Sequence, residues 1–550
     1  MYCPAFLQEE ISVMIYPKLM LRKFEIGLNN FSAPFLETLQ SYQTKDIIIG
    51  IGLFLAISSA LACLCNEALT GGDAAVYLQQ MKELNFSNRS VHIGYYLLGA
   101  GFIRIFPGSD DRAINMMNCF LGAMSVAILY FIAFTISHKH IAAIFSSLFL
   151  LTHHIFLENS LYAEVYTPQV CFLLLAILLW LLDRPIIASL SFALSLLIST
   201  SAILALPLFF ILRPRLRPLL LFCAISLVIA FAVIVPVYRD YFFGARGLLT
   251  IALHQAFSLG FILRREAGEV FFNFFLCIPF VVVGLAELFG RKRFRPFALA
   301  LLSLWLASLF LGEKNWNDFS VQFPTYALLC LVGGLGFHLL LRISNNKPYG
   351  TILSAIMLLS LIAVVVLIKV TKTPTQISVF LPVWFLVVII SCAVLCMLVT
   401  ILPRLRRIRP QVIIVGAIVF AIVTDGFVAF SKLRTISRYH TGYRNTIIEV
   451  SKVGGPEYVI VGHWSQRILF EHYVFQKSYT SRCISIDINA LAGSAGKEEQ
   501  TEAAKKLNEA VTARRQILVL GNYSGLLQDL QRADYKIAQF RYVYIATARN

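Results

Sequence analysis

The sequence has little charge for its length. Only 14% of its 550 residues are Asp, Glu, Lys or Arg, whereas 58% are hydrophobic. A water-soluble protein of this length would need a larger charged surface. Apolar runs long enough to cross a hydrocarbon core of about 30 Å recur along most of the chain. The composition therefore predicts a polytopic integral membrane protein and excludes a soluble globular one.

The sequence also lacks several signatures of chemistry or processing. It has no Gly-rich phosphate loop, since Gly454-Gly455-Pro456 has the pattern of a turn. Its 11 cysteines are scattered, and the pair Cys63 and Cys65 has no second pair at a metal-ligand spacing. No cleavable signal peptide is evident, because residues 1–45 have no clean apolar core. The apolar run that starts near Asp46 is therefore expected to be a retained signal anchor.

The basic excess follows the membrane topology. The formal net charge is +17, which could indicate a nucleic-acid partner. The Lys and Arg residues, however, lie mainly in short loops between spans, and short loops rich in these residues are typically cytoplasmic. If the stretch 186–212 forms two helices broken at Ser199-Thr200-Ser201, the basic loops at 213–217, 291–295 and 404–409 all face the cytoplasm. We therefore predict this break, a cytoplasmic N-terminus, an outward C-terminus and no nucleic-acid partner.

The apolar runs place about thirteen transmembrane helices along the chain. Two of them are the short helices within 186–212, and residues 93–106 are predicted to be an interfacial helix too short to cross. The other predicted spans are 46–65, 113–136, 140–157, 163–182, 218–237, 269–289, 296–312, 324–342, 350–370, 377–401 and 411–431.

The character of the chain changes after the last predicted span. Residues 457–462, 483–488 and 516–521 have strand-like patterns, and 465–476 and 497–515 have helical ones. This alternation predicts a small α/β domain. The predicted organisation is a cytoplasmic N-terminal segment (1–45), a transmembrane catalytic domain (46–431) and an extracytoplasmic α/β domain (432–550) that acts as a lid or docking domain.

One carboxylate lies just beyond the first span. Asp73 follows Gly71-Gly72 in the first outward loop, where the glycines allow the backbone to turn sharply. Asp73 then begins a helix-like stretch. Two interpretations are open: the carboxylate caps this helix, which is worth about 1 kcal/mol, or it performs chemistry at the membrane–water boundary.

Further ionisable residues fall in the outward loops. Glu164 lies at the start of an apolar span, so it faces the bundle interior or caps the span at the interface. His92 begins the predicted interfacial helix. A divalent metal held by Asp73, Glu158, Glu164 and His154 is conceivable, but the spacing does not require one, and no cofactor is needed.

The order of these motifs resembles a known family. The segments GGDAAVYLQQM, HIGYYLLGAGFIRIFPG and LENSLYAEVYT resemble the protein O-mannosyltransferase-like group of the GT-C superfamily, whose relatives include aminoarabinose transferases. The resemblance covers roughly residues 46–240 in motif and the rest in architecture. It implies a GT-C-like catalytic domain. Many relatives have Asp-Glu where this chain has Asp73-Ala74, and His-Pro-Pro where it has His92-Ile93-Gly94.

The resemblance implies an inverting, mannosyltransferase-like hexosyltransferase that uses a polyprenyl-phosphate-linked sugar and acts in glycosylation of a protein, lipid or glycan. Asp73 is implied as the catalytic acidic residue, with Glu164 and His92 beside it and Tyr77 and Tyr95 as substrate-binding candidates. Such chemistry needs cations near the departing phosphate. The candidates are outward-loop residues: Arg239, Arg264, Arg265 and Lys314. The membrane is the plasma or inner membrane of a prokaryote, or the endoplasmic reticulum of a eukaryote.

Two other functions fit the sequence. A transporter or flippase of lipid-linked substrates would carry buried charges near mid-membrane and paired broken segments. A catalytically inactive scaffold would explain the missing second acid after Asp73. Accumulation of an unchanged substrate would favour the transporter, and sugar transfer in membranes would exclude the scaffold.

Overall fold

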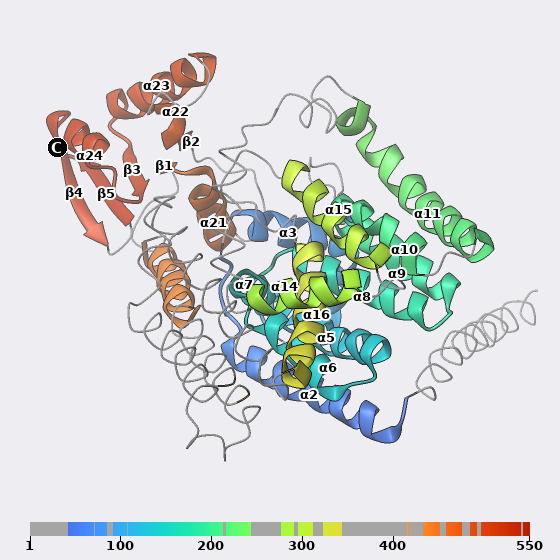
Figure 1. Ribbon diagram of the computed structural model, residues 1–550. Coiled ribbons are helices and arrows are strands. Elements are labelled where there is room, and N and C mark those ends of the chain that lie inside the picture. Colours follow the sequence, from blue (N-terminus) through green and yellow to red (C-terminus); the bar gives the residue numbers. More distant parts are fainter. Residues whose placement is uncertain are drawn as a thin grey trace, which may run out of the picture.

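The protein, described by a computed structural model, is a helical bundle with a small mixed sheet beside it (Figure 1). The structure describes residues 42–70, 72–84, 92–106, 108–212, 216–243, 277–290, 295–311, 323–343, 433–450, 458–475, 484–491, 497–540 and 543–549, together with positions 415 and 419.

The described bundle is built around one central helix, α5, which contacts α2, α6, α7 and α8 and is almost wholly buried. The labelled helices of the bundle are α2 (Thr44–Leu64), α3 (Gly72–Glu83), α4 (Ile93–Ile105), α5 (Asp110–Ser137), α6 (His140–Leu151), α7 (His154–Leu161), α8 (Tyr166–Leu181), α9 (Pro185–Ile198), η1 (Thr200–Ala205), α10 (Leu206–Leu212), α11 (Leu216–Phe243), α14 (Ile278–Gly290), α15 (Arg295–Leu311) and α16 (Phe323–Ile343).

Four described helices are long and apolar enough to cross a membrane: α2, α5, α11 and α16. The helices α2 and α11 expose many large apolar side chains, whereas α5 and α16 are mostly buried. Apolar side chains exposed over whole helix faces are typical of a surface that contacts lipid. The count of about thirteen spans stays a prediction, because three predicted spans and the proposed domain boundary fall in 344–432, which apart from two positions lies outside the described residues.

The predicted span 140–157 is broken in its second half. α6 ends at Leu151, α7 begins at His154, and the two helices are bent by 70°. The buried His153 side chain accepts a hydrogen bond from the Phe156 backbone N–H, so it caps α7 and breaks the helical path. Much of the predicted outward loop 158–162 is consequently helical.

The predicted break in 186–212 is confirmed. α9 ends at Ile198, Ser199 is extended (φ −154°, ψ 127°) and η1 begins at Thr200. Gln169 of α8 reaches the break: its amide nitrogen donates to Ser201 Oγ (2.7 Å) and the Ser199 carbonyl (3.3 Å). A broken helix inside a bundle needs such internal partners for its freed polar groups.

The C-terminal sheet has the strand order β2-β1-β3-β5-β4. β1 pairs in parallel with β2 and β3, whereas β5 is antiparallel to β3 and β4. The elements are β1 (Tyr458–Gly462), α21 (Trp464–Phe475), β2 (Ile484–Asp487), α22 (Ile488–Leu491), α23 (Lys497–Thr512), β3 (Gln516–Leu520), α24 (Ser524–Arg532), β4 (Tyr535–Phe540) and β5 (Val543–Ala548). The elements predicted between 457 and 521 are present, while α24 and the β4–β5 hairpin were not predicted.

The two faces of the sheet pack against different partners. Alternate residues of a strand point to opposite faces, and here Ile517 and Val519 face α23 and α24, whereas Leu518 and Leu520 join the core that continues into the bundle. α21 and an unlabelled helix over 433–450, orange in Figure 1, contribute to this second core. The sheet therefore attaches to the bundle through one face.

Candidate functional site

Two buried asparagines of α5 organise the polar end of the bundle. The Asn115 side-chain amide donates to the carbonyls of Asn66 (2.9 Å) and Ala68 (3.2 Å). Those residues belong to the segment 66–70, which we call the acidic loop because it leads into Asp73. Since an unpaired buried carbonyl costs about 1–3 kcal/mol, Asn115 fixes the path of this loop against α5.

Asn118, one turn further along α5, holds a second loop. Its side-chain amide donates to the Asn159 carbonyl (3.2 Å) and lies within hydrogen-bonding distance of the carbonyls of Tyr162 and Glu164. Asn115 and Asn118 are both fully buried. One face of α5 thus positions both segments from which the predicted carboxylates come. The sequence analysis did not single out this pair, although two Asn side chains one helical turn apart in an apolar span are a recognisable signal.

Asp73 lies one residue inside α3, in its first turn, and it is exposed. It is therefore not at the N-cap position itself. Tyr77, one turn later, is buried, and burial raises the pKa of its hydroxyl well above the usual value. The negative charges of Glu164 and Asp73 raise this pKa further, in that order. Two carboxylates from distant parts of the chain thus act on one tyrosine hydroxyl.

His92 joins the same cluster. Its Nδ1 lies 2.7 Å from the Ile198 carbonyl at the end of α9. A carbonyl only accepts, so Nδ1 carries the proton and Nε2 keeps the lone pair of the neutral ring. Burial lowers the pKa of His92 and so favours the neutral ring, whereas the hydrogen bond to the Ile198 carbonyl raises this pKa and partly offsets the effect of burial. The rings of His92 and Tyr77 are edge to face, with centroids 5.7 Å apart.

Tyr95 completes the aromatic part of the cluster. Its ring also meets Tyr77 edge to face, at 5.4 Å, and its hydroxyl donates to Asn118 Oδ1 at 3.4 Å. The structure therefore brings five predicted site residues together around the start of α3 and α4: Asp73, Tyr77, His92, Tyr95 and Glu164.

The described residues do not show the four predicted cations at this cluster. Arg239 was expected in an outward loop, but α11 runs on to Phe243, so Arg239 lies in a helix; its side chain is not described. After Pro236, which lies inside α11, no further Gly or Pro occurs before Gly244, so no residue in 237–243 disfavours continuation of the helix. Arg264, Arg265 and Lys314 lie outside the described residues. Their role in phosphate binding stays a prediction.

The residues considered as possible metal ligands, Asp73, Glu158, Glu164 and His154, form no metal-binding group in the described part of the chain. No group of three or more His, Cys, Asp or Glu side chains in the described ranges is arranged to hold an ion. The His154 side chain is not among those described.

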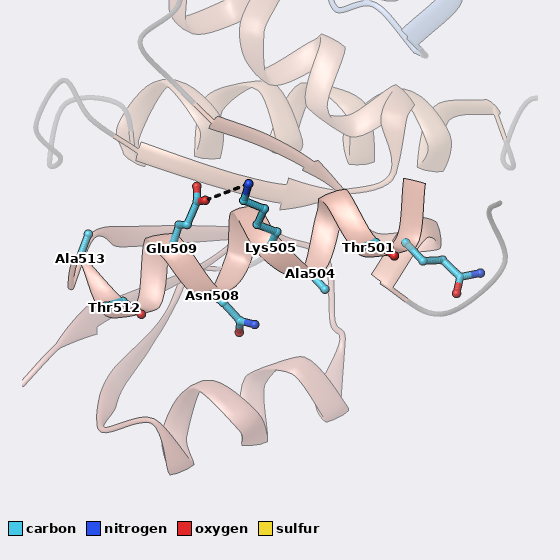
Figure 2. A pocket seen from close by; sticks show the side chains of 8 residues that line it. Thr501, Ala504, Lys505, Asn508, Glu509, Thr512 and Ala513 are labelled. Atoms are coloured by element: carbon cyan, nitrogen blue, oxygen red, sulfur yellow. Dashed lines mark ion pairs between the residues drawn. The ribbon is translucent and has the colours of Figure 1, made fainter. Parts of the chain in front are cut away.

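An open hollow lies on α23, far from the acidic loop in the chain (Figure 2). Its lining comes from one face of this single helix, and Lys505 and Glu509 there form a 4.0 Å ion pair. α23 covers the sheet face opposite to the one that packs toward the bundle. We therefore assign the candidate site to the α3–α4 cluster and not to this hollow.

Close packing of α4 on the broken end of α9 gives a testable feature of the site. A Cβ on Gly94 would lie 3.0 Å from the Ile198 backbone nitrogen, whereas one on Gly101 of the same helix would meet no atom within 4 Å. We expect Gly94→Ala to lower the free energy of unfolding by about 1–3 kcal/mol, because backbone must shift. Gly101→Ala is the control and should be neutral or slightly stabilising.

Thermal unfolding of both variants in the same detergent measures this difference. Equal melting temperatures for the two variants would contradict the close approach of α4 to α9.

Comparisons with known proteins identify solved structures of similar fold. No family model and no curated protein matches the sequence. Among solved structures, the chain is similar to ArnT from Cupriavidus metallidurans in the apo state, with 13% identity and a TM-score of 0.55 over 90% of this chain and 97% of that one. It is equally similar to ArnT bound to undecaprenyl phosphate, with 13% identity and a TM-score of 0.54 over 92% and 98%.

A third match, the Archaeoglobus fulgidus oligosaccharyltransferase tethered with an acceptor peptide, has 13% identity and a TM-score of 0.44 over 86% of this chain and 69% of that one. The match to ArnT covers most of both chains. The protein therefore has the fold of ArnT, with several helices long and apolar enough to cross a membrane, and this agrees with the family resemblance of its sequence at the level of the fold.

Proposed function

We propose that the protein transfers a sugar from a polyprenyl-phosphate-linked donor to an acceptor hydroxyl on the extracytoplasmic face of the membrane. One observation carries the proposal: at one end of a bundle with the ArnT fold, the rings of Tyr77, His92 and Tyr95 pack together, and the Asp73 and Glu164 carboxylates lie near enough to raise the pKa of the Tyr77 hydroxyl. Carboxylates are expensive near a membrane unless they serve a function or are paired. A lipid-linked donor needs no nucleotide loop, which agrees with the lack of one.

In this proposal Asp73 is the general base. Its exposure leaves the carboxylate accessible to an incoming acceptor. Asp73 takes the proton of the acceptor hydroxyl as that oxygen attacks the anomeric carbon. The bond from the anomeric carbon to the lipid phosphate breaks, the configuration inverts, and the phosphate leaves with the bonding electron pair. Arg239, Arg264, Arg265 and Lys314 remain the candidates for stabilising that charge.

The buried neighbours would orient the reactants. Tyr77 stays protonated because burial and the two carboxylates raise its pKa. A neutral His92 held at Nδ1 by Ile198 has a fixed ring orientation, so its Nε2 is available as an acceptor. Glu164, whose backbone carbonyl is held by the Asn118 side-chain amide, places a negative charge near the Tyr77 hydroxyl. Preorganisation of this kind is the main way in which an enzyme lowers a barrier of this type.

Binding of undecaprenyl phosphate tests the first step. A ligand that binds only the folded state at 100 times its Kd stabilises the protein by about 2.7 kcal/mol. We expect undecaprenyl phosphate, but not undecaprenol, to raise the melting temperature of the purified protein. Thermal unfolding at matched lipid concentrations measures this, and equal shifts with the two lipids would refute recognition of a lipid phosphate.

Chemical conversion tests the second step. Proteoliposomes supplied with an undecaprenyl-phosphate sugar and an acceptor should yield a glycosylated product, detected by mass spectrometry. Movement of the unchanged lipid-linked sugar across the bilayer, without product, would replace the transferase by the transporter hypothesis.

A further inference from the structure

The C-terminal unit reaches the acidic loop through Tyr473 of α21. The Tyr473 hydroxyl accepts a hydrogen bond from the Leu69 backbone N–H at 2.9 Å, and the Asp111 carboxylate in the first turn of α5 lies close enough to raise the pKa of that hydroxyl. α21 also packs directly against α3 (Figure 1). Tyr473 thus links the C-terminal unit to the acidic loop beside the central helix of the bundle.

His472 strengthens the same junction. Its Nε2 lies 3.0 Å from Asp111 Oδ1, so a second side chain of α21 ties this helix to the first turn of α5. Burial, and then Asp111, raise the pKa of Tyr473 above its ordinary value. The Tyr473 hydroxyl therefore keeps its proton at physiological pH while it accepts from Leu69.

The helix over 433–450 makes two further contacts with the acidic loop. Ser437 Oγ donates to Asn66 Oδ1 at 2.9 Å, and Arg444 Nη1 donates to the Glu67 carbonyl at 3.0 Å. These contacts come from residues about 370 positions away in the chain. The loop is consequently shared between the bundle and the C-terminal part of the protein.

The partners of the loop backbone alternate along it. Asn115 of the bundle binds the carbonyls of residues 66 and 68, whereas Arg444 and Tyr473 bind the carbonyl of 67 and the N–H of 69. After Thr70 the chain continues through two glycines, Gly71 and Gly72, to Asp73. Only three residues separate Leu69 from Asp73, and the last of them already belongs to α3, so the anchoring of Leu69 restricts where the start of α3 and Asp73 can lie.

We propose that Tyr473 is a positioning residue for Asp73, acting from the C-terminal unit through Leu69. The importance of this positioning for catalysis rests on the proposed function, but the anchoring of the loop does not. A displacement of about 1 Å at a reacting group can cost about 10²-fold in rate. The C-terminal unit is then part of the catalytic apparatus without supplying a group that touches substrate.

Amide hydrogen exchange in the full-length protein tests the proposal. Tyr473→Phe keeps the ring and removes only the hydroxyl. Tyr535→Phe is the matched control, since Tyr535 is a buried tyrosine of the same unit whose hydroxyl donates to the Arg515 carbonyl at 3.1 Å. We expect peptides containing Leu69 to exchange about tenfold faster in Tyr473→Phe, the factor for loss of a hydrogen bond worth about 1.4 kcal/mol. Tyr535→Phe should leave them unchanged.

Unchanged exchange at Leu69 in Tyr473→Phe, or equal acceleration in both variants, would overturn the proposal. Accelerated exchange specific to Tyr473→Phe supports it even if undecaprenyl phosphate fails to bind, in which case only the proposed function falls. Where transfer is measurable, Tyr473→Phe should lower kcat about tenfold or more with little change in the KM for the lipid donor, as expected of a residue that positions Asp73 without binding the donor.

A second pair of variants approaches the junction through Asp111. His472→Gln retains a hydrogen-bond donor, whereas His472→Ala removes it. Faster exchange at Leu69 in His472→Ala, restored toward wild type in His472→Gln, supports the role of the junction, and identical exchange in the two would count against it.

Discussion

Asp73→Asn is expected to lower the rate of sugar transfer by about 10²–10⁴-fold, the usual contribution of a general base. The substitution keeps the size and hydrogen-bonding shape of the side chain while removing its ability to take a proton. The measurement is product formation from an undecaprenyl-phosphate sugar in proteoliposomes at matched protein amounts. Binding of undecaprenyl phosphate should change little, because the base acts on the acceptor.

Glu83→Gln is the matched control for this prediction. Glu83 is an exposed carboxylate at the other end of the same helix, where it accepts a hydrogen bond from Gln79. It should retain wild-type transfer. A loss of melting temperature in Asp73→Asn that accounts for the lost activity would instead indicate that Asp73 stabilises the first turn of α3, and unchanged transfer would eliminate it as the base.

Asn118→Ala is expected to cause the largest loss of stability among the site residues. The substitution removes the donor shared by three carbonyls of the Glu164 loop and leaves a cavity beside them. Each buried acceptor left without a donor costs about 1–3 kcal/mol, so we expect a decrease of about 3 kcal/mol or more in the free energy of unfolding. Transfer activity should be lost as well, since Glu164 is no longer held.

Ser147→Ala is the control for Asn118→Ala. Ser147 is fully buried in α6 and donates one hydrogen bond to the Val126 carbonyl at 2.9 Å, away from both loops. Its loss should cost about 1 kcal/mol and leave transfer intact. Denaturant or thermal unfolding in one detergent compares the variants. Similar destabilisation by both would show that Asn118 does not organise the loop.

The sequence predicted well what depends on local pattern. The short helix predicted at 93–106 is present as α4, and its place at the membrane interface stays a prediction. The strands and helices between 457 and 521 followed from alternating apolar patterns. In both cases the signal lies within about twenty neighbouring residues, where hydrophobic periodicity is read most reliably. The break at Ser199 was predicted differently, from the need to keep three distant basic loops on one side of the membrane.

What the sequence did not predict depends on contacts between distant segments. The break between α6 and α7 is set by a side-chain cap at His153 within a continuously apolar run, so hydropathy gave no sign of it. The roles of Asn118 and Tyr473 depend on partners 44 and 404 residues away. The convergence of Asp73 and Glu164 was expected only from the family resemblance, since no local spacing relates the two.

The long separation between Tyr473 and Leu69 has a consequence for biosynthesis. The acidic loop is made early, but its last anchor is made 404 residues later. At synthesis rates of about 5–20 residues per second, this interval lasts roughly 20–80 s. A nascent chain whose helices already reside in the bilayer would therefore lack an ordered Asp73 segment until α21 has emerged and folded, so a ribosome-bound intermediate should remain inert toward lipid-linked sugars.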